Sequence, residues 1–357
     1  MAALAGYNTA LNGLQTVFMA PTEILASQHF NSLNQLFLNL PVEIGLLTRS
    51  QARVNGEETE GSFSRQKKFL LDKINNGGIS LVVGTHALLS EKINFKNLGL
   101  VIVDEQHRFG VEQRKALKEK MAGVTKPHFL SMTATPIPRS LALTIYGDLD
   151  LSIINELPVG RKPIITRIVE VENRTKAYDF IRAQIKNGRQ AFVVCPLIED
   201  KNLGSEKKSV LTEYEKLSKQ IFSDLRVGYL HGKMLGREKE EIMGKFKNGA
   251  IDVLVSTAVI EVGVDIPNAS VMMIEGADRF GLAQLHQFRG RVGRSVHQSY
   301  CLVFTDNVST SVVERLKFFE KNLDGFKLAE NDLSRRGPGG VWCGTERADG
   351  FEVGEFG

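Results

Sequence analysis

The stretch Leu98–His107 reads LGLVIVDEQH, a nearly continuous apolar run that ends in two adjacent carboxylates, Asp104 and Glu105. Runs of this kind are typical of strands that are buried on both faces of a parallel sheet. Ligands of open parallel sheets bind beyond the carboxyl ends of the strands, so the two acids lie where a site is expected. The segment therefore predicts an α/β protein with its chemistry at the end of this strand.

Further short apolar, β-branched runs repeat this pattern and alternate with segments of helical periodicity. In the first half of the chain we expect strands at Thr16–Ala20, Val42–Leu47, Ile79–Gly84, Leu98–Asp104 and Phe129–Met132. In the second half we expect them at Ile165–Val171, Gln190–Pro196, Arg226–Leu230, Ile251–Ser256, Val271–Glu275 and Ser299–Phe304. Helices are expected at Lys176–Asn187, Glu213–Leu225, Arg237–Asn248 and Val308–Asn322. The alternation predicts two parallel sheets in series, each covered by helices.

The boundary between the two predicted domains is expected near Leu149–Pro163, where ELPVGRKP concentrates proline, glycine and charge. We therefore predict a first domain over residues 1–150, a linker over 151–163 and a second domain over 164–307. A C-terminal helix followed by a Gly-rich tail is expected over 308–357.

Composition narrows the class of protein. Hydrophobic residues make up 42% and charged residues 24% of the 357 positions, as in ordinary globular domains. No apolar run approaches the roughly 20 residues of a membrane helix, and the N-terminus lacks a secretory pattern, so we expect no membrane partner and a cytoplasmic location. Cys195, Cys301 and Cys343 show no CxxC pairing and predict buried or incidental thiols in a reducing compartment. The net charge of +4 is compatible with a polyanionic partner without indicating one.

The acid pair suggests phosphoryl transfer. One carboxylate can hold Mg²⁺, directly or through water, while the next polarises an attacking water. The alternative is an exposed Asp-Glu pair that does no more than end a strand.

A second candidate is the stretch QFRGRVGR at Gln287–Arg294, which sets Arg289, Arg291 and Arg294 among glycines. Guanidinium groups carry a fixed charge and a planar fork, so they can stabilise charge on a transferring phosphoryl group. Glycine lets the backbone come close to a ligand. The alternative is a generic basic loop that holds phosphate or nucleic acid by charge alone.

Four more segments place Thr or Ser at or just beyond the end of a predicted strand. They are MAPTE (Met19–Glu23), VVGTHAL (Val82–Leu88), MTATP (Met132–Pro136) and VSTAVIEVGVDIP (Val255–Pro267). Hydroxyls and backbone N–H groups in such places can bind the phosphates of a nucleic acid without reading its bases. Ordinary turn chemistry explains any one of these segments, but it is a poor explanation for four of them interleaved with the acids and the arginines.

Taken together and in this order, the segments resemble the motor of the superfamily 2 helicases. MAPTEILASQH is similar to motif Ia of that motor, VVGTHALL to motif Ib, DEQH to motif II, TAT to motif III, STAVIEVGVDIP to motif V and QLHQFRGRVGR to motif VI. The resemblance extends from the first residue to about Gly339. It implies two tandem RecA-like parallel-sheet domains with a short helical C-terminal extension, and ATP with Mg²⁺ as cofactors.

Finer features are similar to the RecG family of branched-DNA helicases, namely DEQHRFGVEQR (Asp104–Arg114), MAPTEILA (Met19–Ala26) and DGFKLAENDLSRRGPG (Asp324–Gly339). This resemblance implies a monomeric, ATP-dependent 3′–5′ helicase and translocase that acts on stalled forks and Holliday junctions. One alternative is the transcription–repair coupling translocase, which shares the motor and typically has Tyr where this chain has His286. A nucleic-acid-binding module that has lost catalysis is another alternative. An RNA helicase is disfavoured because RFG follows DEQH.

The resemblance also implies roles for single residues. Asp104 would hold Mg²⁺, through water, and Glu105 would activate the attacking water, while Arg291 and Arg294 would contact the nucleotide phosphates. The other residues expected at the nucleotide are His107, Gly263, Asp265 and Gln287. Those expected along the DNA are Pro21, Thr22, Thr85, His86 and Thr257. Thr133 and Thr135 would couple the state of the nucleotide to the grip on DNA.

The chain departs from the family pattern in two places. No GxxxxGK[ST] phosphate loop occurs in the 357 residues, and the resemblance implies that the chain begins just after the lysine of that loop, without the wedge domain that precedes it. Because that loop makes the main β- and γ-phosphate contacts, we expect negligible ATP hydrolysis from the chain as it stands. After Gly339 the sequence GVWCGTERADGFEVGEFG leaves the pattern, and no role is carried onto it.

Overall fold

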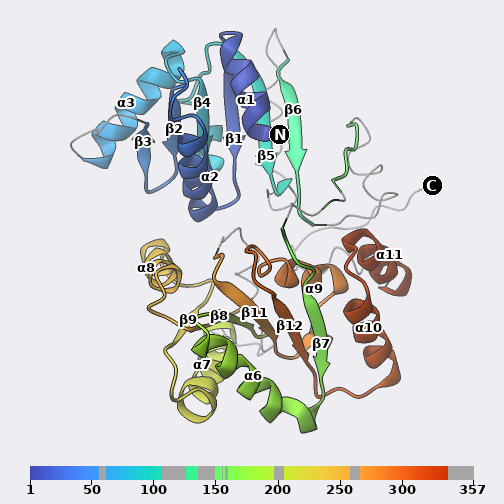
Figure 1. Cartoon of the computed structure of the whole chain (residues 1–357). Coiled ribbons are helices and arrows are strands. Elements are labelled where there is room, and N and C mark those ends of the chain that lie inside the picture. The colour runs from blue at the N-terminus through green and yellow to red at the C-terminus, as the bar shows by residue number, and fades with distance from the viewer. Residues whose placement is uncertain are drawn as a thin grey trace. The chain divides into compact units, whose positions relative to one another are not determined.

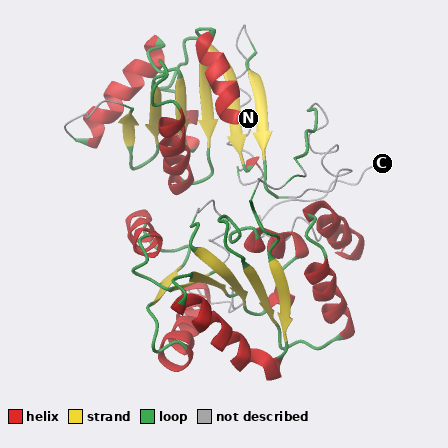
Figure 2. Cartoon of the chain, viewed as in Figure 1, coloured by secondary structure: helices red, strands yellow, loops and turns green. Residues whose placement is uncertain are grey.

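A computed structural model describes residues 1–55, 62–106, 109, 126–135, 149–154, 156, 160–196, 205–257 and 266–336. The chain forms two compact units, Met1–Ala134 and Thr135–Gly357. Each unit is built on its own six-stranded sheet with helices against both faces (Figure 1 and Figure 2). The expected α/β class with two sheets in series is confirmed. The domain limits at 150 and 163 remain a prediction, since 136–148 and 157–159 lie outside the described residues.

The first sheet has the strand order β3-β2-β4-β1-β5-β6. Its strands are β1 (Gln15–Met19), β2 (Ile44–Leu47), β3 (Ala52–Val54), β4 (Leu81–Gly84), β5 (Leu98–Asp104) and β6 (His128–Met132). All neighbours pair in parallel except β2 and β3, which are antiparallel. The edge strand β3 was not predicted, because three residues with an exposed Arg53 at the centre give no periodic signal.

Helices α1 (Ala2–Leu11) and α2 (Glu23–Leu36) pack on one face of this sheet, and α3 (Phe63–Asn76) packs on the other. Helix α2 begins where the side chain of Thr22 accepts a hydrogen bond from the Leu25 amide, at 3.3 Å. The short 3₁₀ helix η1 (His86–Leu89) follows β4 directly. The predicted site segments therefore follow the C-terminal ends of β1, β4, β5 and β6. Because these strands are parallel, all four segments lie at the same end of the sheet.

The second sheet has the strand order β7-β12-β11-β8-β10-β9, and every neighbouring pair is parallel. Its strands are β7 (Ile165–Val169), β8 (Gln190–Val194), β9 (Val227–Leu230), β10 (Val253–Ser256), β11 (Ala269–Ile274) and β12 (Tyr300–Phe304). All six strands expected in this half are present, with ends that differ by at most two residues.

The helices of the second unit divide between the two faces of its sheet. Helix α6 (Arg174–Lys186), which follows the 3₁₀ helix η3 (Val171–Asn173), and α7 (Ser205–Lys216) cover one face. Helix α7 continues into a π-helical turn, η4 (Leu217–Ile221). Helices α8 (Gly236–Lys247), α9 (Leu282–Arg289), α10 (Thr310–Lys321) and α11 (Gly325–Arg336) cover the other face, and the 3₁₀ helix η6 (Ala277–Arg279) precedes α9.

A buried glutamine begins the central strand of each sheet. Gln15 donates through Nε2 to the carbonyls of Ile74 and Ile79 at 3.0 and 2.9 Å. Gln190 donates in the same way to the carbonyls of Phe246 and Ile251. Each amide satisfies carbonyl groups that burial would otherwise leave unpaired, and so ties a helix end to the start of the strand beside it.

Cys195 and Cys301 are buried, as expected, and Cys343 lies outside the described residues. Among the described helices, none is both long enough and apolar enough to cross a bilayer.

Candidate active site

The acid pair lies at the C-terminal end of strand β5 in the first sheet. The strand is buried along Leu100, Val101, Ile102 and Val103, and Asp104 is its last residue. Glu105 follows with φ of 49°, a left-handed conformation that a non-glycine residue adopts at a cost of about 1–3 kcal/mol. Strain of this kind, held by the surrounding structure, is characteristic of functional sites. The turn points two consecutive carboxylates at different partners.

The Glu105 carboxylate is held by the segment that follows β6. Thr133 Oγ1 donates to Glu105 Oε2 at 2.8 Å, and the amide of Ala134 donates to Oε1 at 3.4 Å. The amide of Glu105 in turn donates to the Met132 carbonyl at 2.8 Å. The predicted catalytic carboxylate and the predicted coupling threonine are therefore in direct contact.

The Asp104 carboxylate turns instead toward helix α2. His29 Nε2 lies 3.0 Å from Asp104 Oδ2, and the side chains are 26% and 18% exposed. His29 is not among the residues predicted from the sequence to form the site. The signal was present in QH of MAPTEILASQH, but neither charge nor spacing along the chain indicated that this ring would meet an acid 75 residues away.

The acid pair fits a magnesium ion of the kind that nucleotides bring. Mg²⁺ keeps several waters and binds through one or two carboxylates together with substrate phosphates, rather than in a cage made by the protein alone. Among the described residues no group of three or more His, Cys, Asp or Glu side chains could hold a metal. Asp104 and Glu105 are the carboxylates that would hold such an ion.

The predicted DNA-contacting residues of the first unit lie on the same edge of the sheet but differ in exposure. Pro21 and Thr22 are half-buried and His86 is exposed, whereas Thr85 is only 2% exposed. The side chain of Thr85 therefore offers little surface to a ligand. Gly84 before it approaches Leu47 so closely that a Cβ would collide with the Leu47 carbonyl oxygen.

Glu23, next to Thr22, holds the loop that follows β2. The hydroxyls of Thr48 and Ser50 both donate to Glu23 Oε2, the former at 3.2 Å. Thr48 is fully buried and also accepts from the amides of Ser50 and Gln51. Glu23 of the PTE sequence thus fixes a second loop beside its own, a contact that was not predicted from the sequence.

In the second unit, the two arginines predicted to contact phosphate follow helix α9, and the glutamine predicted to support them lies within it. Gln287 lies in the last turns of the helix and is half-buried, Arg291 is 7% exposed and Arg294 is half-buried. Gly293 has φ of 78°, and a Cβ there would lie 2.9 Å from Ile164 Cγ1. Only glycine fits this turn, which brings Arg294 back to donate through Nε to the Gly290 carbonyl at 3.4 Å.

Arg289 has a different position from its two neighbours in the motif. Its side chain is only 2% exposed and stacks on Phe319, with the guanidinium carbon 4.3 Å from the ring centroid. It donates to the Phe319 carbonyl at 3.1 Å, to Thr166 Oγ1 at 3.4 Å and to His286 Nδ1 at 2.9 Å. Arg289 joins α9 to α10 and β7, so the cluster of three arginines read from the sequence is a core residue followed by two loop residues.

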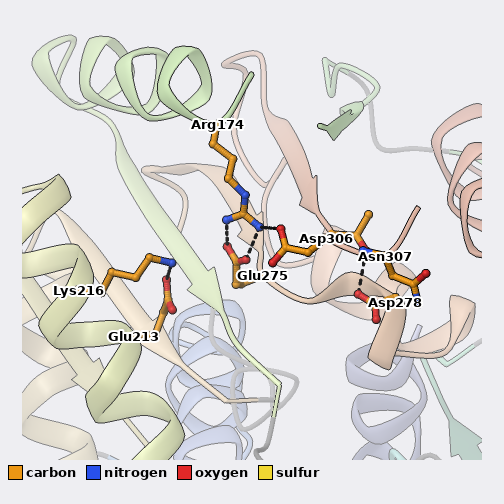
Figure 3. Close-up of polar contacts among 8 residues, drawn as sticks. Arg174, Glu213, Lys216, Glu275, Asp278, Asp306 and Asn307 are labelled. Atoms are coloured by element: carbon orange, nitrogen blue, oxygen red, sulfur yellow. Dashed lines mark hydrogen bonds and ion pairs between the residues drawn. The ribbon is translucent and has the colours of Figure 1, made fainter. Parts of the chain in front are cut away.

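A polar network fixes the turn that leads into α9 (Figure 3). Arg174, at the start of α6, donates through both Nη atoms to Glu275, at 3.2 and 2.8 Å, and through Nη2 to Asp306 at 2.8 Å. Burial alone would lower the pKa of Arg174, but the hydrogen bonds and charge of Glu275 raise it above its ordinary value. Thr305 donates to Asp278 Oδ1 at 2.8 Å. The network ties the ends of β11 and β12 to each other.

Helices α10 and α11 hold the other side of this turn. Arg315 donates to the carbonyls of Asp278 and Phe280, both at 2.7 Å. Asp332 Oδ2 accepts from the amide of Leu282, the first residue of α9, at 3.0 Å. The predicted tail segment is thus anchored to the helix that precedes the two arginines.

Three of the residues expected at the nucleotide lie outside the described residues, namely His107, Gly263 and Asp265. Thr257 is described and 1% exposed, and Thr135 is half-buried at the start of the second unit.

Comparisons with known proteins agree with this arrangement. Residues 1–144 match the DEAD/DEAH box helicase model, and residues 173–296 match the helicase conserved C-terminal domain. The ATP-dependent DNA helicase RecG of Thermotoga maritima is 47% identical over 348 residues, which cover 96% of this chain and 42% of the relative. The RecG of Staphylococcus aureus strain Mu50 is 48% identical over 339 residues, covering 95% of this chain and 47% of the relative. The chain thus spans less than half the length of these curated relatives.

Among solved structures, RecG bound to a three-way DNA junction superposes with a TM-score of 0.76 and 43% identity, over 97% of this chain and 44% of that one. Dbp5 of S. cerevisiae, solved with RNA and ADP BeF3, has a TM-score of 0.60 at 15% identity, over 90% of this chain and 81% of its own, and shows the shared fold alone.

The fold, the paired helicase models and the acid pair at the end of β5 define the motor region of a superfamily 2 helicase. Within that class, the chain belongs to the RecG family.

Proposed function

We propose that the intact protein is an ATP-dependent 3′–5′ DNA helicase and translocase that acts on forks and Holliday junctions during recombination and repair in the cytoplasm. The observation that carries the proposal is the acid pair: Glu105 is held by Thr133 and Ala134, while Asp104 is turned to His29. The RecG structure bound to a three-way junction supports the class of DNA substrate, through 43% identity over 97% of this chain.

In this proposal Asp104 would hold Mg²⁺, through water, and Glu105 takes a proton from the water that attacks the γ-phosphate, with ADP as the leaving group. The metal, when bound, offsets charge on the phosphates. Glu105 is suited to its role because two donors fix its carboxylate on a strained turn, so little reorganisation is required when it acts. In the second unit, Arg291 and Arg294 are the proposed phosphate contacts and Gln287 supports their loop, while His107, Gly263 and Asp265 are the other residues proposed to bind nucleotide.

On the DNA side, the exposed His86 and the half-buried Pro21 and Thr22 are the residues of the first unit that offer surface to a ligand. Thr85 and Thr257 are buried, so they contribute through the shape of their turns rather than through their hydroxyls. Thr133 and Thr135 couple nucleotide state to DNA contact, and the contact of Thr133 with Glu105 supports this role. The motor works as a monomer.

The chain as it stands contains no GxxxxGK[ST], and we propose that it hydrolyses ATP negligibly. The test compares ATP hydrolysis by this chain and by the intact protein, each with and without forked DNA. Turnover stimulated by forks only in the intact protein supports the proposal. Turnover by the short chain would contradict this account of the phosphate site. No turnover by either would favour a nucleic-acid-binding module without catalysis.

The role of Glu105 has its own test. In the intact protein Glu105→Gln keeps the shape and the contact with Thr133 but removes the base. We expect ATP binding to persist while hydrolysis falls by about 100-fold or more. Normal turnover in this variant would reject Glu105 as the base.

A further inference from the structure

The imidazole of His29 is fixed from two sides within the first unit. Its ring stacks on Phe18 of β1, with centroids 4.5 Å apart and an interplanar angle of 28°. Its Nε2 lies 3.0 Å from Asp104 Oδ2 on β5. Phe18 is 4% exposed, so the surface on which the ring rests is part of the core.

Helix α2 holds the backbone of His29 in the same firm way. Ala26 and Phe30, on either side of His29 along the helix, are buried against the sheet at 0% and 4% exposure. Thr22 caps the helix two turns before His29. Contacts that do not involve Asp104 therefore hold both the backbone and the ring of His29, so the ring can serve as a fixed partner for the carboxylate.

The hydrogen bond leaves one oxygen of Asp104 for another ligand. An ionised carboxylate has only acceptor atoms, so the proton of the His29–Asp104 contact belongs to Nε2 of the imidazole. With Oδ2 engaged, Oδ1 is the oxygen that remains for the water shell of a cation. Carboxylates that serve metals are commonly hydrogen-bonded in this way, and removal of the partner typically lowers metal affinity by about 10- to 100-fold.

We propose that His29 is a positioning residue that orients the Asp104 carboxylate toward the nucleotide-bound Mg²⁺. The inference rests on the proposed function, because it assigns the cation at Asp104 to the ATP site. His29 touches neither nucleotide nor metal, and its effect passes wholly through Asp104. A purely structural histidine would alter folding stability but leave the metal requirement of the folded protein unchanged.

Three substitutions in the intact protein separate the features of the ring. His29→Phe keeps an aromatic ring on Phe18 and removes the donor. His29→Asn is too short to reach Asp104, and His29→Gln keeps a donor of suitable length. His128→Asn is the matched control, because His128 is an exposed histidine on β6 of the same unit.

Two readouts are measured for each protein: the affinity of the protein–ADP complex for Mn²⁺ by electron paramagnetic resonance, and the Mg²⁺ concentration that gives half-maximal ATP hydrolysis with forked DNA. We expect His29→Phe and His29→Asn to weaken Mn²⁺ binding by about tenfold and to raise the Mg²⁺ requirement by a similar factor. His29→Gln should restore much of both, and His128→Asn should match the native protein.

Native Mn²⁺ affinity and Mg²⁺ requirement in folded His29→Phe and His29→Asn would overturn the inference and leave the proposed function intact. If His29→Phe does not fold, His29→Asn decides by the same measurements. A native protein that neither binds Mn²⁺ with ADP nor hydrolyses ATP on forks would overturn the proposed function, and this inference with it.

Discussion

Thr133 and Glu105 are joined directly: the threonine hydroxyl donates to Glu105 Oε2 across 2.8 Å, although 28 residues separate them in the sequence. The contact joins the ends of two neighbouring parallel strands, β5 and β6. A shift of β6 or of the segment after it would move the donor away from the carboxylate. The position of Thr133 thus sets the position of the proposed base.

Thr133→Val in the intact protein should lower ATP turnover by about tenfold, because a hydrogen bond to a charged group contributes about 1.5–3 kcal/mol and valine has nearly the shape of threonine without the donor. Thr133→Ser keeps the hydroxyl and should remain close to native. Steady-state ATP hydrolysis with saturating forked DNA makes the comparison. Equal turnover in the two variants would show that the hydroxyl does not support Glu105.

Much of this fold could be predicted because buried parallel strands leave a strong local signal. Leu98–Asp104 has the predicted ends, and every other predicted strand is present. Two of the parts that were not predicted lack such a signal. Strand β3 is three residues long, and the π-helical turn at Leu217–Ile221 continues a helical pattern that the sequence cannot distinguish from an α-helix.

Only the parts of the site that lie close together in the sequence could be predicted from it. Asp104 and Glu105 were found because they are adjacent and end a strand. The contact of Asp104 with His29 depends on the packing of α2 over β1 and β5, which no spacing along the chain reveals. The arginines show the same limit: Arg289 and Arg291 are two residues apart in one motif, yet Arg289 lies against Phe319 in the core.

Arg289 and Arg294 form a matched pair that separates stability from catalysis. Arg289→Ala should lower the free energy of unfolding of the second unit by about 3 kcal/mol or more, because it opens a cavity and removes the hydrogen bonds to Phe319 and Thr166. Arg294→Ala should cost less, about 1 kcal/mol, because the half-buried side chain loses its hydrogen bond to the Gly290 carbonyl. Denaturant unfolding of both variants measures the difference.

The same pair should behave differently in catalysis. In the intact protein Arg294→Ala should reduce ATP turnover by about 1,000-fold while nucleotide binding persists, as expected for an arginine that stabilises the charge of the transferring phosphoryl group. A strongly destabilised Arg294→Ala, or one with native turnover, would contradict the separate roles given to the two arginines.

We expect the buried His286 to make the second unit less stable against unfolding at acidic pH. Burial, followed by the charge of Arg289, lowers the pKa of His286 from 6.5 to about 4. Because the folded pKa is lower than the unfolded one, the unfolded chain binds the proton more readily. The contribution of neutral His286 to the free energy of unfolding is fully present above about pH 6.5. It is lost as the pH falls through that value toward 4, by roughly 3 kcal/mol in all.

His286→Gln retains an acceptor for Arg289 but removes the titration. The free energy of unfolding of the native protein should therefore fall more steeply than that of His286→Gln between pH 6.5 and 4, and the two profiles should run parallel above pH 7. Urea unfolding at a series of pH values measures both. Parallel profiles throughout the acid range would mean that the pKa of His286 is not lowered in the folded protein.

Asp332 should prove to be the anchor of α9, whose N-cap, Gly281, has no side chain to cap the helix. The Asp332 carboxylate is 6% exposed and accepts from the amide of Leu282, where the helix dipole favours a negative charge. Asp332→Ala should therefore cost about 1–2 kcal/mol and speed hydrogen exchange of the amides that begin α9. Glu330→Ala, an exposed change on the same helix, is the control. Because α9 leads into Arg291 and Arg294, the proposed phosphate contacts, the intact Asp332→Ala protein should also lose ATP turnover. Native exchange at Leu282 in this variant would show that α11 does not hold the start of α9.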